Sequence, residues 1–194
     1  MNKLKSGIRE QCRAARVQIG HEAQLNADTR IAARLGQLVS DLGPTIVSVF
    51  WPITQAREID TRPFIDSLVR SGIAVALPCV SPGEPGVMHM RQFSAEDDLR
   101  TNNWGSKEPA SGRQVAPTEV DLVVVPALAA GRNGNRIGYG SGYYDRFLKL
   151  VHCPSVAIVY SSCLFDQIPA DPHDVRVTYV ITELEAIVTG EPAT

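Results

Sequence analysis

One glycine-rich segment, residues 134–146, holds the residue types and spacing best suited to chemistry. Three of its glycines alternate with larger residues, at Gly138, Gly140 and Gly142. Glycine lets the backbone approach an anion closely and point successive N–H groups at it, and the start of a following helix favours negative charge. The segment therefore favours phosphate binding over the alternative, a tight turn that needs positive φ angles. Arg136 before the glycines and Asp145 after them support this choice.

The segment differs from the common nucleotide-binding and nucleophile motifs. It lacks both the Gly-x-x-x-x-Gly-Lys-Ser/Thr pattern and the Gly-x-Gly-x-x-Gly spacing. Ser141 does not complete Gly-x-Ser-x-Gly, because Tyr139 occupies the first position. No zinc-ligand spacing connects the four histidines, His21, His89, His152 and His173. These absences disfavour a standard kinase, a dehydrogenase, a serine hydrolase and a dedicated zinc enzyme.

Further charged residues are candidates for the same site. Asp145 and Asp174 each follow a predicted sheet end, where two carboxylates could hold Mg2+. Glu58 or Asp60, after the first predicted strand, could accept hydrogen bonds from a polar heterocycle, although helix capping explains Asp60 equally well. Basic residues recur at helical spacing at Lys5, Arg9, Arg13 and Arg16. That stripe is either a solvated helix face or a surface that faces the bound phosphates.

Helices and strands alternate along the chain and would position these residues. Apolar residues between Leu4 and Ile19 predict a first helix with an apolar side and a basic side. Residues 28–42 predict a second helix, with Gly43 as its stop signal. A third begins with Thr61 as N-cap and Pro63 at the first helical position. A fourth is predicted over residues 143–151.

Strands are predicted at residues 45–50, 73–77, 87–93, 121–126, 155–160 and 177–182. Strand, helix and strand within about thirty residues are typical of a βαβ unit with parallel strands. Residues 78–117, rich in Pro, Gly, Ser and Asn, predict loops over a sheet edge. The chain is therefore predicted to be a single α/β domain over residues 1–194, with three layers and a mostly parallel sheet between helices.

Composition excludes several other classes. Nineteen Lys and Arg against 21 Asp and Glu leave a net charge of −2, so no global field attracts nucleic acid or an anionic membrane. The four cysteines have no Cys-x-x-Cys spacing and are predicted to be reduced. Residues 1–16 lack the apolar region of a secretory signal, and no stretch approaches the roughly 20 apolar residues of a membrane span. We expect a cytoplasmic monomer with no nucleic-acid or membrane partner.

The motifs and their order resemble those of the 5-formyltetrahydrofolate cyclo-ligase family, also called 5,10-methenyltetrahydrofolate synthetase, over almost the whole chain. The likeness rests on residues 5–9 with Arg13 and Arg16, and on residues 58–61, 104–109, 121–126, 134–146 and 173–174. The long glycine block is the main evidence for the resemblance, because the Lys-x-x-Ile-Arg motif alone would be weak evidence. Where some relatives carry a basic residue inside the glycine loop, this chain has Tyr139 and Ser141. It also has Ala130 and Gly131 where the family often has Phe-Asp.

The resemblance implies a three-layer fold similar to the NagB/RpiA/CoA-transferase-like fold. It also implies an ATP-dependent ligase that forms a C–N bond, with ATP as co-substrate and Mg2+ as cofactor. The formyl oxygen of 5-formyltetrahydrofolate would attack the γ-phosphate and give an imidate-type phosphate. The 10-nitrogen would then close the ring to 5,10-methenyltetrahydrofolate, with release of ADP and phosphate. The partners would be these small molecules.

The resemblance also implies roles for single residues. ATP would contact Lys5, Ser6, Gly7, Ile8, Arg9, Arg136, Ile137, Gly138, Tyr139, Gly140, Ser141, Gly142, Tyr143 and Tyr144. The folate would contact Ile53, Glu58, Trp104, Tyr139, Gly140, Ser141, Gly142 and Tyr143, with Trp51 as the alternative to Ile53. Asp145 and Asp174 would hold the metal. The catalytic residues would be Arg136, Tyr143 and Asp145.

Two alternatives remain open at this stage. An enzyme with the same fold could act on another phosphorylated or acyl substrate, and ATP turnover that does not depend on folate would identify it. A non-catalytic folate or nucleotide binder could use the basic N-terminal helix on RNA. Salt-sensitive RNA binding without turnover would identify the binder. The near-neutral charge and the aspartates at 145 and 174 argue against it.

Overall fold

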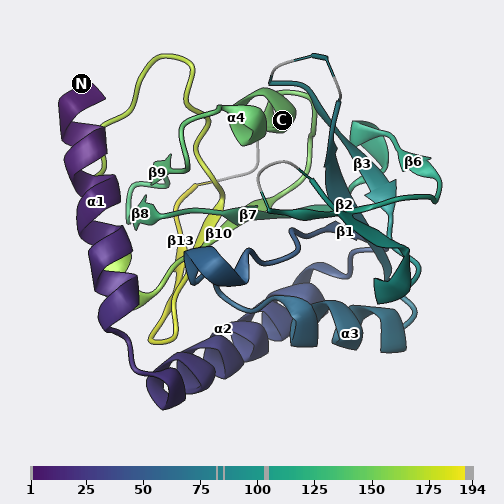
Figure 1. The fold of residues 1–194 in the computed structure, drawn as a ribbon, viewed down its shortest axis with the longest axis horizontal. Coiled ribbons are helices and arrows are strands. Elements are labelled where there is room, and N and C mark those ends of the chain that lie inside the picture. The colour runs from purple at the N-terminus through teal and green to yellow at the C-terminus, as the bar shows by residue number, and fades with distance from the viewer. Residues whose placement is uncertain (1, 82, 85, 103–104, 191–194) are drawn as a thin grey trace.

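An eight-stranded sheet forms the middle of the protein in the computed structural model, which describes residues 2–81, 83–84, 86–102 and 105–190 (Figure 1). Its strands are β1 (Ile46–Ser48), β2 (Ala74–Val80), β3 (Met88–Gln92), β6 (Gln114–Val115), β7 (Leu122–Pro126), β10 (Ser155–Ile158), β12 (Tyr179–Ile181) and β13 (Ala186–Val188). Their order is β13-β12-β10-β7-β1-β2-β3-β6. The pairs from β12 to β2 are parallel, and β13, β3 and β6 extend the two edges in antiparallel fashion.

Two smaller sheets and several short helices complete the strand layer. β8 (Ala129–Gly131) lies between β11 (Leu164–Phe165) and β9 (Arg136–Ile137), and β4 (Leu99–Thr101) pairs with β5 (Lys107–Pro109). Single 3-10 turns are η1 (Thr54–Ala56), η2 (Glu96–Asp98), η3 (Pro117–Glu119) and η4 (Ser161–Cys163). The segment predicted as loops over a sheet edge thus contains three strands, β4, β5 and β6, in addition to the predicted β3.

Helices lie on both faces of the large sheet, so the predicted three-layer α/β architecture is confirmed. The four helices are α1 (Asn2–Gln18), α2 (His21–Leu42), α3 (Arg62–Arg70) and α4 (Tyr143–Leu148). α2 and α3 cover one face of the sheet, and α4 lies on the other (Figure 1). α1 lies at one end of the molecule and packs with the same core cluster as α4. Successive residues of a strand point to opposite faces. Leu122 and Val124 therefore pack with Ile31 and Phe64 below the sheet, and Val123 packs in the cluster above it.

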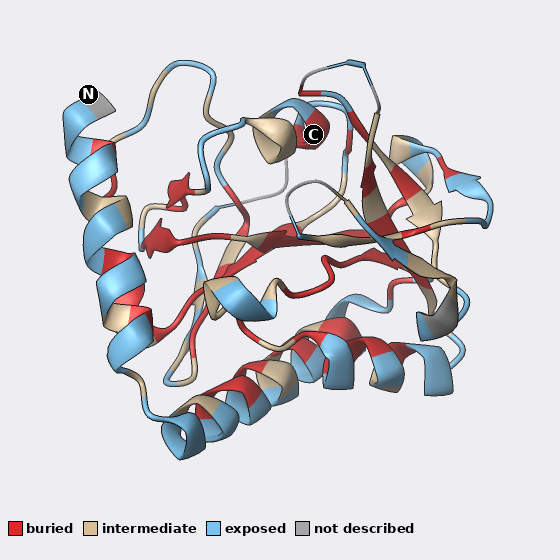
Figure 2. Cartoon of the chain, viewed as in Figure 1, coloured by how far each residue is buried: buried red, intermediate tan, exposed pale blue. Residues whose placement is uncertain are grey.

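Burial follows this layering. Buried residues run along the central strands and the inner faces of α2 and α3 (Figure 2). The second helix was predicted to begin at residue 28, seven residues after the observed start of α2 at His21. The prediction followed the apolar pattern, and the buried face of α2 starts only at Ala27. Gly43 ends α2 as predicted, and it adopts the left-handed conformation. No helix among the described residues has the length and apolarity needed to cross a bilayer.

The prediction of separate apolar and basic sides for α1 is wrong. At about 100° per residue, positions 5, 9, 12 and 16 fall within one narrow arc. Lys5, Cys12 and Arg16 are buried there, whereas Leu4 is 59% exposed and Arg13 is exposed. The inward face of α1 is therefore itself partly basic.

The start of α3 also differs from the prediction. Thr61 is the N-cap as expected, but Pro63 is the second helical residue, because α3 begins at Arg62. The Thr61 hydroxyl donates to the Phe50 carbonyl oxygen at 2.7 Å instead of capping the helix. The Asp60 carboxylate accepts the N–H of Arg62 at 3.1 Å in its place.

Candidate functional site

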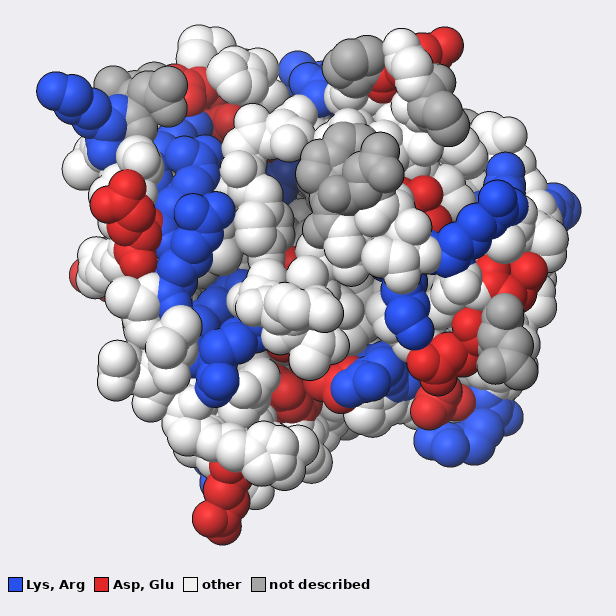
Figure 3. All heavy atoms as spheres, viewed as in Figure 1, with Lys and Arg blue, Asp and Glu red and all other residues white. Residues whose placement is uncertain are grey.

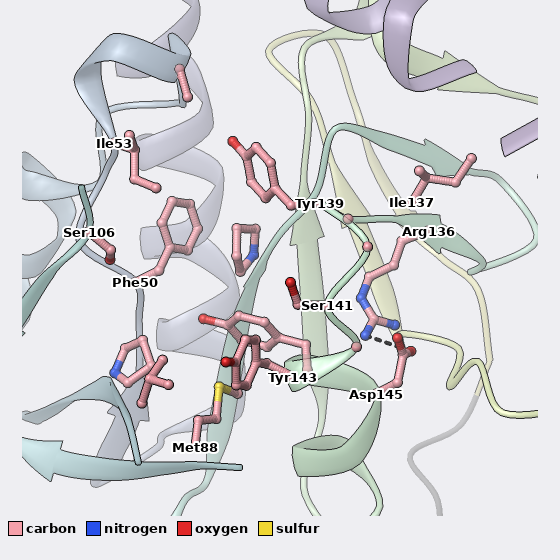
Figure 4. Close-up of a pocket in the computed structure, with 18 of the residues that line it drawn as sticks. Phe50, Ile53, Met88, Ser106, Arg136, Ile137, Tyr139, Ser141, Tyr143 and Asp145 are labelled. Atoms are coloured by element: carbon pink, nitrogen blue, oxygen red, sulfur yellow. Dashed lines mark hydrogen bonds and ion pairs between the residues drawn. The ribbon is translucent and has the colours of Figure 1, made fainter. Parts of the chain in front are cut away.

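A cavity of about 720 Å³ opens beside the carboxyl ends of β1, β2 and β7. This is where open α/β sheets bind ligands. Phe50 and Ile53 lie on one side of it, Arg136 and Asp145 lie on the other, and Tyr139 lies between the two sides (Figure 4). The cavity therefore has an apolar end and a charged end, with the glycine loop between them.

The glycine loop joins β9 to α4 along one wall of the cavity. Gly140 (φ +109°) and Gly142 (φ +69°) adopt conformations that L side chains rarely take. Gly138 has no positive φ, and a Cβ added to it would meet nothing within 4 Å. Within the described part of the chain, no carbonyl or side chain accepts a hydrogen bond from the amides of these three glycines. The loop thus presents free N–H groups, as the phosphate-binding interpretation requires.

The basic face of α1 meets this loop. The Arg9 guanidinium donates from Nε to the Gly138 carbonyl oxygen at 2.9 Å, and it takes part in none of the ion pairs between described residues. Lys and Arg side chains gather along the α1 side of the molecule (Figure 3), although the net charge is only −2. Lys5 and Arg9 line the cavity, so these two residues are not part of a purely solvated helix face, and their contact with phosphates stays a prediction.

Three of the predicted ATP contacts do not reach the cavity. Ser6, Gly7 and Ile8 are not among the residues that line it. α1 begins at Asn2, so the free N–H groups of its first turn end at Lys5. The amides of Ser6, Gly7 and Ile8 lie deeper in the helix and are used by its own hydrogen bonds.

Two ion-pair clusters form the charged end. Arg136 and Asp145 lie 2.9 Å apart, and the Asp145 carboxylate also accepts the N–H of Val175 at 3.1 Å. Burial lowers the pKa of Arg136, and the Asp145 charge opposes this effect. Lys5 Nζ lies 2.6 Å from Asp171 and also contacts Asp174. Burial lowers the pKa of Lys5, but the hydrogen bonds to the two aspartates outweigh it and the pKa is raised.

Carboxylates near Lys5 form a possible cation site. Asp171, His173 and Asp174 each have one ligand atom within 4.8 Å of the others. Asp145 lines the same cavity but is not part of this group. The structure therefore brings the two predicted metal ligands, Asp145 and Asp174, to one cavity while each is bound to its own cationic side chain.

Glu58 is the main polar group of the apolar end. Its side chain is 7% exposed, and both of its oxygens are engaged: Oε2 accepts the N–H of Ile53 at 2.7 Å, and Oε1 accepts the Tyr139 hydroxyl at 2.6 Å. Burial raises the pKa of Glu58, while these two hydrogen bonds and the Arg16 charge lower it in part. Glu58 and Tyr139, predicted separately as folate contacts, are thus directly bonded.

Aromatic and apolar residues surround Glu58. Trp51 and Ile53 both line the cavity, so the choice between them is not exclusive. The Trp51 ring lies 5.7 Å from that of Phe93, and Lys107 Nζ lies 5.7 Å above it. Trp104, the remaining predicted folate contact, lies outside the described residues.

Several residues that line the cavity were not predicted from the sequence. Met88 and Asp171 come from two separate segments that only the fold brings together. Glu108 also lines the cavity and accepts hydrogen bonds from the Val80 N–H (3.1 Å) and the Asn102 amide (2.6 Å). It lies inside the motif at residues 104–109, so that motif could have identified it.

The protein is thus an α/β protein with one cavity that has two ends. One end has a loop of free amides and basic side chains, and the other has apolar walls and the buried carboxylate of Glu58. The sequence profile of the 5-formyltetrahydrofolate cyclo-ligase family matches residues 1–183, and the chain belongs to that family.

Individual relatives agree with this assignment. The chain is 36% identical over 130 residues to a 5-formyltetrahydrofolate cyclo-ligase of Mycolicibacterium smegmatis, covering 64% of this chain and 67% of the relative. It is 24% identical over 195 residues to the Mus musculus cyclo-ligase, covering 94% and 95%. The structure of an Aquifex aeolicus 5,10-methenyltetrahydrofolate synthetase superimposes with a TM-score of 0.84 at 27% identity, over 98% of this chain and 95% of that one.

A Mycoplasma pneumoniae synthetase structure shares the fold with a TM-score of 0.75 at 21% identity, over 92% of this chain and 98% of that one. The predicted family resemblance and the mostly parallel α/β fold are therefore confirmed. The likeness to isomerases and CoA transferases, and the roles of single residues, stay predictions.

Proposed function

We propose that this protein converts 5-formyltetrahydrofolate to 5,10-methenyltetrahydrofolate at the expense of ATP, and that residues 1–194 form one cyclo-ligase domain. The observation that carries the proposal is the single cavity in which Arg9 and the free amides of the glycine loop lie at one end and Glu58 lies at the other. A phosphoryl donor and a flat heterocycle bound there would meet at Tyr139 to Tyr143.

The chemistry explains why ATP is needed. The formyl oxygen attacks the γ-phosphorus, an O–P bond forms, the bond to the β-phosphate oxygen breaks, and ADP leaves. The formyl carbon then carries a phosphate ester instead of an amide-like oxygen, so it has a good leaving group. The 10-nitrogen attacks this carbon, so that a C–N bond closes the ring, and it loses its proton to solvent. The bond between the carbon and the phosphate oxygen then breaks and phosphate departs. The protein's contribution is mainly positioning and charge neutralisation.

At the charged end, the proposed roles follow from charge and hydrogen-bond capacity. The amides of Gly138, Gly140 and Gly142 donate to the transferring phosphoryl group, and Arg9 neutralises its charge. Arg136 lies 2.9 Å from Asp145, which fixes its guanidinium at the edge of the loop. Lys5 and Arg136 supply further positive charge, in place of the basic loop residue of some relatives.

Asp145 and Asp174 are the proposed ligands of Mg2+. Each uses one oxygen for its basic partner, Oδ1 of Asp145 for Arg136 and Oδ2 of Asp174 for Lys5. Among the described residues, Asp145 Oδ2 has no hydrogen-bond partner, and Asp174 Oδ1 has only His173 Nε2 at 3.8 Å. A hard cation prefers such carboxylate oxygens. When bound, Mg2+ supplies charge that neutralises the phosphates.

At the apolar end, Glu58 is the proposed acceptor for N–H groups of the pterin ring. Each of its oxygens keeps one lone pair after bonding Ile53 and Tyr139, because a carboxylate oxygen can accept two hydrogen bonds. Trp51 and Ile53 provide apolar walls for the ring. Tyr143 lies between the two ends (Figure 4), where the formyl group would approach the phosphate.

The test is direct. Purified protein is mixed with Mg-ATP and 5-formyltetrahydrofolate, and the methenyl absorbance and ADP are measured together. We expect equal amounts of both products and neither when one substrate is omitted. Absence of both overturns the proposal, and ADP formation independent of folate indicates a different acceptor. Size-exclusion chromatography and cell fractionation test our further proposal of a cytoplasmic monomer without nucleic-acid or membrane partners.

A further inference from the structure

Arg146 joins two separate loops of the molecule through one side chain. From α4, its Nε donates to the Gly86 carbonyl oxygen at 2.6 Å, and its Nη2 donates to the Ser141 carbonyl oxygen. The residue takes part in none of the ion pairs between described residues, and it does not line the cavity. The proposed reaction does not use Arg146, although Ser141 lies in the glycine loop and Gly86 lies two residues before Met88 of the cavity wall.

Two glycines leave room for this guanidinium. A Cβ added to Gly86 would lie 2.0 Å from Arg146 Nη2, and one added to Gly142 would lie 3.1 Å from Arg146 Nη1. Real Cβ atoms essentially never come within 3.0 Å of another heavy atom, so the first of these contacts is impossible without a shift. Both glycines also have positive φ angles, +86° and +69°. The guanidinium therefore fills a space that only glycine leaves open at position 86.

The contact with Ser141 sets the direction of the next peptide N–H. In a trans peptide group, the C=O of one residue and the N–H of the next point in opposite directions. None of the peptide bonds between described residues is cis. The Ser141 carbonyl is directed to Arg146, which lies outside the cavity, so the Gly142 N–H points away from the guanidinium. Gly142 itself lines the cavity, and none of the described residues accepts its N–H.

The same guanidinium lies against the Tyr143 ring. Arg146 Cζ is 5.8 Å from the centre of this ring, within the range of a cation–π contact. Tyr143 lines the cavity between its apolar and charged ends (Figure 4). Arg146 therefore contacts the residues on both sides of Gly142, the Ser141 carbonyl and the Tyr143 ring, and connects them to Gly86.

We infer that Arg146 is a positioning residue for the charged end: by bridging the Ser141 and Gly86 carbonyls, it holds the Gly142 N–H in the direction from which it donates to the transferring phosphoryl group. The inference rests on the proposed function, in which that amide contacts the γ-phosphate of ATP. The bridge depends on the shape of the side chain more than on its charge, because a planar guanidinium presents its donors in a fixed fork. A lysine at position 146 has the charge but not the fork.

The experiment measures the affinities for Mg-ADP and for Mg-AMP-PNP, an ATP analogue whose imido group prevents phosphoryl transfer, by titration calorimetry. Arg146→Ala should weaken AMP-PNP binding about tenfold, as for the loss of one charge-assisted hydrogen bond. The ADP affinity should stay the same, because ADP lacks the γ-phosphate. Arg146→Lys should restore little of the AMP-PNP affinity. The control Arg70→Ala should change neither affinity, because Arg70 is exposed at the end of α3 and does not line the cavity.

Gly86→Ala tests the bridge from its other end. The new Cβ would displace the guanidinium, so the AMP-PNP affinity should fall by a similar factor. In an Arg146→Ala background, Gly86→Ala should cause no additional loss of affinity, because the two residues act as one unit. The positive φ of Gly86 strains an alanine in either background, so Tm should fall in both. Affinity and Tm therefore respond differently, as a general loss of structure would not allow.

Several outcomes would overturn the inference. They are an unchanged AMP-PNP affinity in Arg146→Ala, equal losses for AMP-PNP and ADP, full affinity in Arg146→Lys, and an additional loss from Gly86→Ala in the Arg146→Ala background. If Arg146→Ala does not fold, Arg146→Gln replaces it and must show the same selective loss. A wild-type protein that binds AMP-PNP but makes no methenyl product would refute the proposed function, while the affinities of the variants would still decide the role of Arg146. A wild-type protein that does not bind AMP-PNP would overturn both.

Discussion

Replacing Gly138 with alanine separates phosphate binding from simple turn formation in the glycine loop. Gly138 has no positive φ, and its added Cβ would meet nothing within 4 Å, so the fold itself tolerates the change. If the loop were only a turn, Gly140 would be required for its φ of +109° and Gly138 would not. If the loop binds phosphate, the new methyl group of Gly138→Ala occupies space that the phosphoryl group needs.

The two substitutions Gly138→Ala and Gly140→Ala should change the stability in opposite directions. A backbone-compatible glycine-to-alanine change stabilises a protein by about 0.4–1 kcal/mol, because the unfolded chain loses freedom. For a chain of this size, Gly138→Ala should leave Tm unchanged or raise it by up to about 4 °C. Gly140→Ala should cost about 1–3 kcal/mol through backbone strain and lower Tm. For activity, Gly138→Ala should reduce kcat/KM for ATP about 100-fold through displacement of the phosphate.

The assay combines thermal melts with initial rates of methenyl formation at varied ATP and varied folate. Arg13→Ala serves as a control variant, because Arg13 is exposed and does not line the cavity. Gly138→Ala with wild-type kcat/KM for ATP and a normal Tm would refute the phosphate role of the loop. Loss of activity together with a large drop in Tm would show that Gly138 is needed for folding instead, which also contradicts the argument.

Three further predictions concern the charged end. Asp145→Asn should abolish magnesium-dependent activity, and it should lower the free energy of unfolding by about 1–3 kcal/mol because buried Arg136 loses its counter-charge. Mg2+ titrations of activity and thermal melts check the two effects. A variant that is active and as stable as wild type would contradict them. Arg9→Ala should raise the KM for ATP about tenfold or more and leave that for folate unchanged, so equal increases in both would exclude a phosphate role. Burial raises the pKa of Asp174, but the hydrogen bonds from Lys5 and from the Asp171 N–H, with the Lys5 charge, outweigh it and keep that pKa below its usual 3.8. The Lys5–Asp174 pair therefore stabilises the fold above that pH, and its contribution is lost as pH falls through the folded-state pKa. Lys5 has a raised pKa, so its contribution to stability is present below about pH 10.5 and lost at higher pH. In denaturant unfolding, the free energy of unfolding of Asp174→Asn should fall less with decreasing pH than that of wild type. An unchanged pH dependence would count against a stabilising Lys5–Asp174 pair.

The central strands could be predicted from the sequence because they are buried on both faces. β7, for example, has four consecutive buried residues, a pattern typical of a parallel sheet. β8, β9 and β11 contain two or three residues each, too few to show any period. β13 likewise escaped prediction, because its three residues lie at an exposed edge with an intermediate or exposed burial pattern.

The glycine loop was predictable because its residues are contiguous in sequence. The contacts between distant residues were not. The Glu58–Tyr139 hydrogen bond joins residues 81 positions apart, and nothing in either local pattern indicates it. The orientation of α1 was wrong for a related reason. Two stripes at helical spacing compete in its sequence, and Lys5 and Arg16 are buried because they contact acceptors on distant segments, Asp171 and the Ala127 carbonyl.

Consecutive residues of the glycine loop are bonded toward opposite ends of the cavity, and this has a mechanistic consequence. The Gly138 carbonyl accepts the Arg9 guanidinium at 2.9 Å, while the next residue, Tyr139, donates to Glu58 at 2.6 Å. A shift of the loop toward one substrate therefore alters the contacts available to the other. The proposed phosphoryl transfer would require the formyl oxygen and the γ-phosphorus to approach within about 3–3.5 Å. We therefore expect residues 138 and 139, held by Arg9 of α1 on one side and by Glu58 on the other, to set this separation in the proposed reaction.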